Sequence, residues 1–191
     1  MLRSAILALI LALSACSASE AQTGSCEMYM NFDTTEEAPQ WYAVNDGVMG
    51  GLSSGGPRFD KGVMVFEGVI NTNGGGFSSL RSAVQEGALA EAEGIKLRVR
   101  SDGRTYKLTL RSNSVWRGRR VSFQAPIPQS TLGEWAEVMV PFSELRGTIF
   151  GRNVRGAIFD KSAVVELGII LADGQDGPFR LDVDWVKSCV L

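Results

Sequence analysis

Histidine is absent from the 191-residue sequence, and its absence removes the commonest catalytic chemistry. Histidine is the usual general base, a frequent metal ligand and the side chain that titrates near physiological pH. An enzyme built from this chain would depend on carboxylates such as Asp46 and Asp102. The sequence therefore favours a protein that is not an enzyme, and no cofactor or metal is expected.

The sequence also lacks a large excess of either charge. It has 19 lysines and arginines against 21 aspartates and glutamates, for a net charge of −2. Nucleic-acid binding requires a basic excess, so nucleic acid is not an expected partner. The length suits one domain with a sizeable core, and we assign that domain to residues 27–191.

No apolar run is long enough to span a bilayer. The run Ala5–Leu13 has about nine residues, against the roughly 20 that a spanning helix needs. With Arg3 before it, this run predicts a signal peptide over 1–15, followed by a flexible tether over 16–26. The ending L-S-A-C at Cys16 is typical of a bacterial lipobox and predicts lipidation of Cys16; the alternative is cleavage near Ala21. Lipidation predicts a periplasm-facing anchor in a bacterial cell envelope, with the outer membrane favoured.

Cysteines are few, and either cleavage leaves Cys26 and Cys189 at opposite ends of the mature domain. In an oxidising, exported setting we expect them to form a disulfide; the alternative is two buried free thiols. The disulfide would make the first and last strands neighbours.

What the sequence has in abundance is period-two patterning. Apolar residues alternate with Lys, Arg and Thr over 95–100 and again over 106–111. Further strands are predicted at 63–70, 121–125, 137–142, 164–171 and 179–186. In the last of these, Phe179, Leu181, Val183 and Trp185 should share one face. The sequence predicts an all-β fold, an antiparallel β-sandwich or jelly roll.

Two short segments punctuate this pattern. Ser101-Asp102-Gly103-Arg104 lies between two alternating runs, which predicts a β-hairpin. Val84–Glu93 is the only helical candidate, and Gly87 interrupts it.

The glycine-rich stretch Trp41–Gly56 predicts an ordered, heavily turned loop that begins on a buried aromatic residue. Gly51–Gly55 matches G-x-S-x-G, the nucleophile-elbow pattern. That motif needs a strand-turn-helix and a histidine base, so we interpret the match as a turn.

A second glycine cluster spans Asn71–Arg81. Its polar side chains could line a site beside Asn45 and Asp46, or they could satisfy backbone groups of the loops. The candidate ligand- or partner-binding residues are Trp41, Asn45, Asp46, Met49, Ser53, Asn73, Phe77, Ser78, Arg81, Arg100, Asp102 and Arg104.

Two further polar groups have a functional and a structural interpretation. The acidic turn 172–177 could bind calcium, but calcium wants six to eight oxygens and only two side chains here are obvious donors. A cationic face could meet anionic lipid, glycan or an acidic protein, unless Asp182 and Asp184 neutralise it. The cations are Lys96, Arg98, Arg100, Arg104, Lys107, Arg111, Arg117, Arg119 and Arg120.

Five stretches in order resemble the complex I intermediate-associated protein 30 family. They are V-N-D-G-V-M-G-G-L-S (44–53), N-G-G-G-F-S-S-L-R (73–81), R-V-R-S-D-G-R-T-Y-K (98–107), W-A-E-V-M-V-P-F (135–142) and G-P-F-R-L-D-V-D-W-V (177–186). The resemblance implies a galactose-binding-like β-sandwich. It also implies a non-catalytic, chaperone-like role, because the mitochondrial members assist assembly of NADH:ubiquinone oxidoreductase.

Two functions follow from these observations. The first is a lipid-anchored module that binds a protein partner. The alternative is an envelope module that binds a glycan or small ligand through the loops around Asn45, Asp46, Phe77 and Arg81.

Overall fold

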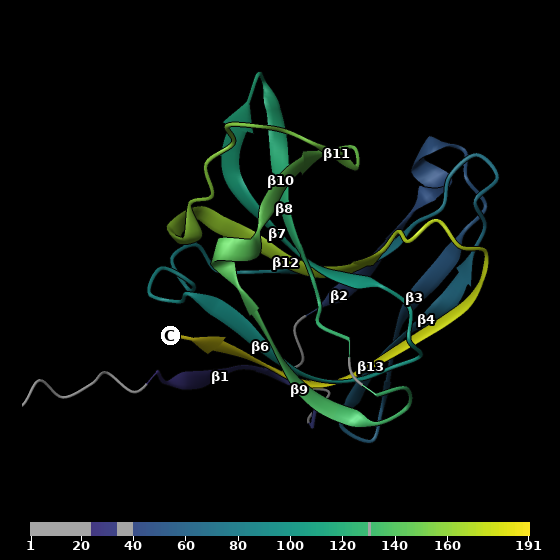
Figure 1. The fold of residues 1–191 in the computed structure, drawn as a ribbon, viewed down its shortest axis with the longest axis horizontal. Helices are drawn as coiled ribbons and strands as arrows, with labels where there is room; N and C mark the ends of the chain where they lie inside the picture. The colour runs from purple at the N-terminus through teal and green to yellow at the C-terminus, as the bar shows by residue number, and fades with distance from the viewer. Residues whose placement is uncertain (1–23, 34–39, 130) are drawn as a thin grey trace, which may run out of the picture.

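Two antiparallel sheets face each other around one apolar core (Figure 1). The computed structural model describes residues 24–33, 40–129 and 131–191. The predicted signal peptide, the lipidation site Cys16 and most of the tether lie outside these residues. The sequence-predicted fold class, an all-β sandwich, is confirmed.

The first sheet has six strands and is organised around its longest member, β13. Along one edge β13 pairs with β6, and along the other it pairs first with β4 and then with β1. Cys26 and Cys189 lie opposite each other in the register and are joined by a disulfide. The strands are β1 (Cys26–Asn31), β3 (Ser54–Asp60), β4 (Val63–Ile70), β6 (Gly94–Ser101), β9 (Trp135–Pro141) and β13 (Gly177–Cys189).

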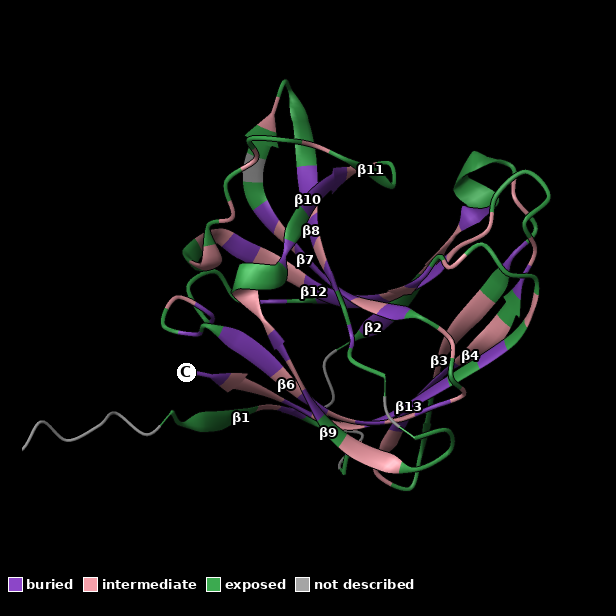
Figure 2. Cartoon of the chain, viewed as in Figure 1, coloured by how far each residue is buried: buried purple, intermediate pink, exposed green. Residues whose placement is uncertain are grey.

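The second sheet has seven strands in the order β11-β10-β8-β7-β12-β5-β2. They are β2 (Trp41–Asn45), β5 (Ser78–Ala83), β7 (Tyr106–Trp116), β8 (Arg119–Pro126), β10 (Arg146–Ile149), β11 (Arg152–Asn153) and β12 (Val164–Leu171). The described residues also form three short 3-10 turns: η1 (Asp46–Met49), η2 (Phe142–Glu144) and η3 (Lys161–Ala163). Figure 2 shows buried residues recurring along the strands of both sheets and exposed ones at η1 and the β7–β8 tip. Among the described residues, no helix has the length and apolar character to cross a membrane.

Strand positions follow the sequence pattern closely, but the helix prediction is wrong. The predicted segments 63–70 and 164–171 coincide with β4 and β12. Residues 84–93 instead form turns before β6, and Gly87 adopts a positive φ of 86°. Val84, Leu89 and Ala92 are buried in the core from this irregular segment, which explains their apolar spacing.

The hairpin prediction at 101–104 is also wrong. β6 pairs with β13 and β9 in the six-stranded sheet, whereas β7 pairs with β8 and β12 in the other. The Asp-Gly turn therefore carries the chain from one sheet to the opposite one. Both strands bury one face in the same core, so their alternation is indistinguishable from that of a paired hairpin.

The predicted face of Trp185 is wrong, because β13 contains a β-bulge just before this residue. The register of β13 against β6 shifts between Val183 and Trp185, which leaves Asp184 as an extra residue. Beyond the bulge the side chains change faces, so Val186 is fully buried and Trp185 is only half-buried. The ammonium of Lys187 lies 4.4 Å from the Trp185 ring centroid.

Candidate functional site

The glycine-rich stretch 41–56 is more regular than predicted, because it comprises β2, η1 and the start of β3. Its centre is Asp46, which begins η1 and is completely buried. The Asp46 carboxylate accepts hydrogen bonds from Ser53 N at 2.9 Å and Ser53 Oγ at 2.5 Å. It also accepts from Gly76 N at 2.6 Å and Phe77 N at 3.3 Å. One buried carboxylate thus joins both glycine clusters.

The surroundings keep Asp46 ionised. Burial raises the pKa of the carboxyl, but the donors from Ser53, Gly76 and Phe77 outweigh it, so the pKa lies below its ordinary value. Ser53 Oγ in turn accepts a hydrogen bond from Asn71 N at 3.0 Å. The carboxylate is committed to holding loop backbone in place.

Two glycines are required because backbone passes so close to this carboxylate. A Cβ on Gly51 would lie 2.3 Å from Asp46 Cγ, and one on Gly75 would lie 2.3 Å from Asp46 Oδ2. Gly51 N also donates to the carbonyl oxygen of Asp46 at 3.0 Å. The glycines of these motifs therefore serve close packing around Asp46.

Asn45 is committed in the same way. Its Nδ2 donates to Gly55 O at 3.0 Å, and its Oδ1 accepts from Ser78 Oγ at 2.6 Å. Ser78 is buried, and Gly55 leaves room for it, since a Cβ there would lie 2.3 Å from Ser78 Oγ. The alternative that these polar groups satisfy loop structure describes the arrangement better than an open polar site.

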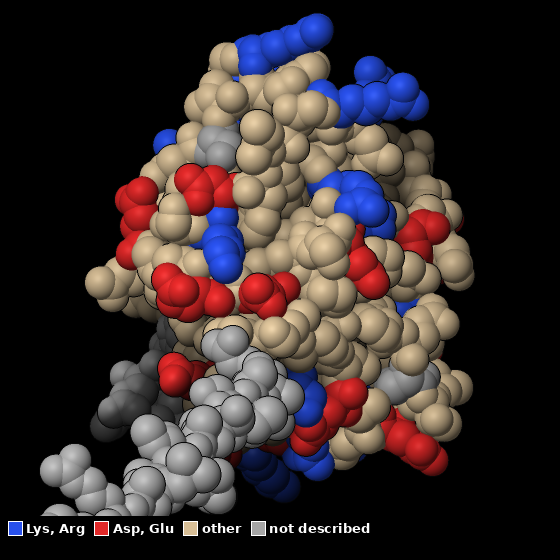
Figure 3. All heavy atoms as spheres, turned by 60° about the vertical axis from the view of Figure 1, so that its left-hand side comes forward, with Lys and Arg blue, Asp and Glu red and all other residues tan. Residues whose placement is uncertain are grey.

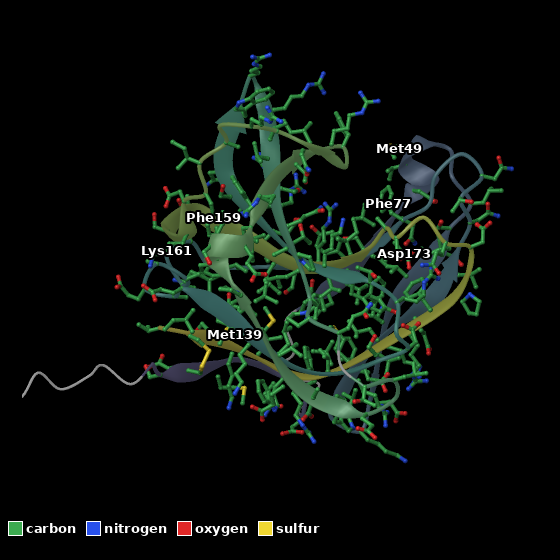
Figure 4. All side chains as sticks on the ribbon, in the orientation of Figure 1. Met49, Phe77, Met139, Phe159, Lys161 and Asp173 are labelled. Atoms are coloured by element: carbon green, nitrogen blue, oxygen red, sulfur yellow. A yellow bond between two sulfur atoms is a disulfide. The ribbon has the colours of Figure 1, made fainter. Side chains whose placement is uncertain are left out.

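What this scaffold presents to solvent is apolar. The apolar tip, consisting of Val48, Met49 and Leu52, is 73%, 58% and 66% exposed respectively. Figure 4 shows Met49 at the end of the projecting loop, above Phe77. Trp41, by contrast, is buried against Phe32 with a ring-centroid separation of 6.3 Å, and among the described residues its Nε1 has no hydrogen-bond partner. Asn73 is exposed at the neighbouring turn.

Asp102 and Arg104 form a second cluster at the crossover between the sheets. Arg104 binds Asp173 through Nε at 2.9 Å and Nη2 at 2.6 Å, and its Nη1 reaches Gly177 O at 3.1 Å. The Asp102 carboxylate accepts from Arg180 N at 2.7 Å and Arg104 N at 3.0 Å. Burial raises the pKa of Asp173, but hydrogen bonds from Arg104 lower it below its ordinary value. These groups fix the β12–β13 turn, and the described residues contain no cluster of metal-ligating side chains.

The outer face of the seven-stranded sheet holds a polar group that the sequence did not reveal. Tyr42, 47% exposed, donates its hydroxyl to Glu166 Oε2 at 2.6 Å. The same carboxylate pairs with Arg111 at 3.3 Å and with Arg81 at 3.6 Å. The pairing register of the neighbouring strands β2, β5, β12 and β7 brings these four residues together, and no local sequence motif marks the group.

The cations of the six-stranded sheet are neutralised there, as the structural alternative predicted. Arg100 Nε donates to Asp182 Oδ2 at 2.9 Å, and Arg98 pairs with Asp184. Both guanidinium groups also lie about 5 Å from the Trp135 ring centroid. Arg100 and Asp102 line one pocket together with Arg180 and Asp182, and none of these residues bonds to the Asp46 carboxylate.

Comparison with known proteins supplies a family. The family model described as complex I intermediate-associated protein 30 matches residues 30–183. A probable mitochondrial member from Caenorhabditis elegans is 35% identical over 98 residues, which cover 47% of this chain and 27% of that protein. The mitochondrial member from Mus musculus is 25% identical over 177 residues, which cover 81% of this chain and 53% of that protein. The matches thus span about half of these relatives or less.

Solved structures support the fold alone. A family 11 carbohydrate-binding module from Clostridium thermocellum, in complex with a β-1,3-1,4-mixed-linked tetrasaccharide, has a TM-score of 0.61 at 16% identity. The alignment covers 85% of this chain and 94% of that one. The family 11 module of the cellulase Lic26A-Cel5E from the same organism has a TM-score of 0.63 at 14% identity, covering 86% and 94%.

The predicted location is wrong. The lipobox-like ending at Cys16 predicted a lipid-anchored protein of a bacterial cell envelope. The named relatives from Caenorhabditis elegans, Caenorhabditis briggsae and Mus musculus are all mitochondrial proteins.

Proposed function

Because this chain belongs to the complex I intermediate-associated protein 30 family, we propose that it is a non-catalytic module that holds a protein partner during assembly of NADH:ubiquinone oxidoreductase. The family name supports the role, and the geometry supports a binding surface in place of an active site. Ser53 of the G-x-S-x-G match is buried and bonded to Asp46, in a chain without histidine. A nucleophile of that kind has no base here.

The observation that carries the proposal is the apolar tip on a rigid polar scaffold. When a partner covers water-exposed apolar side chains, binding becomes more favourable by about 25 cal/mol per Å² of apolar surface that is buried. Asp46 and Asn45 fix the loop before binding, so little conformational entropy is lost when the partner docks. Val48, Met49 and Leu52 are therefore the residues expected to anchor the partner.

Replacing the tip by serines (V48S/M49S/L52S) should abolish partner capture without affecting folding. Truncating anchor residues at the centre of an interface commonly weakens binding by tenfold or more. The tagged wild-type chain and the variant would be recovered from detergent-solubilised membranes, and co-purified subunits of NADH:ubiquinone oxidoreductase quantified by mass spectrometry. We expect about tenfold less of these subunits with the variant.

A matched control is M28S/V69S/V190S, which makes three comparable changes at exposed apolar positions of the six-stranded sheet and its end. It should capture the partner as the wild type does. The proposed role of the tip is refuted if the control loses as much partner as the tip variant does. It is also refuted if the wild-type chain captures no subunit.

A second candidate function, binding of a glycan, is favoured by one observation: Tyr42 is exposed on a polar sheet face. Aromatic rings with nearby hydrogen-bonding groups suit sugar recognition, but shared fold is a weak warrant for shared function. Tyr42 is tied to Glu166, and Arg81 and Arg111 are paired with the same carboxylate. These groups are already satisfied by one another.

Affinity electrophoresis in gels containing soluble mixed-linked β-glucan separates the two functions. We expect wild type and Tyr42→Ala to migrate alike with and without the polysaccharide. Retardation of the wild type that Tyr42→Ala removes would establish glycan binding at this face and displace the protein-binding proposal.

A further inference from the structure

The β7–β8 tip and the neighbouring β10–β11 turn form a cationic end that the proposed partner surface does not use. The five arginines of this arginine end are all exposed: Arg117, Arg119, Arg120, Arg152 and Arg155. The two turns are in contact, since the guanidinium of Arg119 lies 5.4 Å from the Phe150 ring centroid. Figure 3 shows blue side chains at the top of the molecule, where Figure 1 places the β7–β8 tip, with the red ones below them.

These arginines lack acidic partners within the described part of the chain. None of the five takes part in the ion pairs found among residues 24–33, 40–129 and 131–191. The sequence contains no aspartate or glutamate over 112–133 or over 145–159. The six-stranded sheet differs, because there Arg98, Arg100 and Arg180 are each paired with a carboxylate. The positive charge of the arginine end is therefore available to an external anion.

Large apolar side chains project among these charges. Phe150 is 76% exposed, Ile158 is 81% exposed and Val115 is 62% exposed. Trp116 is half-buried, and the guanidinium of Arg117 lies 4.4 Å from its ring centroid. Basic residues interleaved with exposed aromatic and aliphatic ones are typical of surfaces that lie at a membrane interface.

The turn residues are not those that the backbone favours. Trp116 pairs with Arg119 and Ile149 pairs with Arg152, so each hairpin turns through two residues, Arg117-Gly118 and Phe150-Gly151. Arg117 and Phe150 adopt positive φ values of 49° and 48°, where Asn, Asp or Gly would be preferred. The β3–β4 turn has the same form, with Lys61 at a φ of 51°, so the backbone alone does not distinguish the arginine end. What distinguishes it is the group of exposed arginines around Phe150.

We propose that the arginine end is a docking surface for an anionic lipid bilayer. The guanidinium groups would bind lipid phosphates, while Phe150 and Trp116 would enter the headgroup region. A lipid surface fits better than nucleic acid because one turn carries a largely exposed phenyl ring, that of Phe150, and the net charge of the chain is −2. The inference goes beyond the proposed function, since it concerns a surface other than the apolar tip.

The test is co-sedimentation of the purified full chain with vesicles of phosphatidylcholine alone or mixed with phosphatidylglycerol. We expect binding to the anionic vesicles only, weakened by added salt. Near an anionic membrane each arginine contributes about fivefold in affinity, so R117Q/R119Q/R120Q should weaken binding by about 100-fold. Phe150→Ser keeps all five charges and should also weaken binding. Circular dichroism and thermal melting would verify that both variants remain folded.

The matched control R58Q/K61Q/K187Q removes three cations, one each from β3, the β3–β4 turn and β13, and should retain binding. Equal loss in this control would mean unspecific attraction and would overturn the proposal. Absence of binding to anionic vesicles would overturn it too. Retention of the protein on a polyglutamate column without binding to anionic vesicles would also overturn it, because the occupant of the arginine end would then be an acidic protein.

Discussion

Replacing Asp46 with alanine is expected to lower the free energy of unfolding by about 3–5 kcal/mol. The substitution leaves the backbone amides of Ser53 and Gly76 without their carboxylate acceptor and creates a void between the two glycine clusters. Breaking a buried, fully hydrogen-bonded charge is among the few single changes with so large an effect. Urea unfolding followed by intrinsic fluorescence would measure the change.

Asp46→Asn separates charge from shape and gives a dependence on pH. Folding lowers the pKa of Asp46, so its contribution is complete above the ordinary value of 3.8 and is lost as the pH falls through the lower folded value. We expect the stability gap between wild type and Asp46→Asn to be large at neutral pH and to shrink in acid. A gap that stays constant with pH, or an Asp46→Ala variant as stable as the wild type, would contradict the scaffold role.

Removing the disulfide (C26S/C189S) is expected to lower the free energy of unfolding by about 5 kcal/mol, an upper figure from chain entropy. The bridge closes a sequence separation of 163 residues, so it strongly restricts the unfolded chain. It also fastens β1 to the end of β13.

The control for this prediction is chemical reduction. Reductant should lower the melting temperature of the wild type to that of C26S/C189S and leave the variant unchanged. If the oxidised wild type and the variant melt together, the disulfide does not stabilise the native fold as expected.

Strand positions could be predicted because each strand buries one face, and that requirement is written into local alternation. The pairing of the strands could not be predicted in this way. β6 and β7 alternate like the two strands of a hairpin, yet they belong to opposite sheets and bury their apolar faces in the core between the sheets. The face of Trp185 was missed for a related reason, since one extra residue at Asp184 reverses every face beyond it and leaves no local signal.

The candidate site was predictable in part for the same physical reasons. Glycine clusters around Asn45-Asp46 and Gly74-Gly75-Gly76 indicated close backbone approach, and the structure places Asp46 at their contact. The polar groups of the two clusters hydrogen-bond to one another through contacts about 30 residues apart in the sequence, such as that of Asp46 with Gly76. No local sequence pattern encodes such contacts. The sequence shows the apolar residues of the tip, but only the structure shows that the Asp46 scaffold holds them together at the surface.

Site-specific photo-crosslinking tests the central claim most directly. A photoreactive phenylalanine analogue would replace Met49 in the apolar tip or, in a matched protein, Val69 on the six-stranded sheet, where the side chain is 49% exposed. After illumination in membranes that contain assembling NADH:ubiquinone oxidoreductase, we expect a covalent adduct with one of its subunits from position 49 and none from position 69. An adduct from position 69 alone, or from neither position, would contradict the proposed role of the apolar tip.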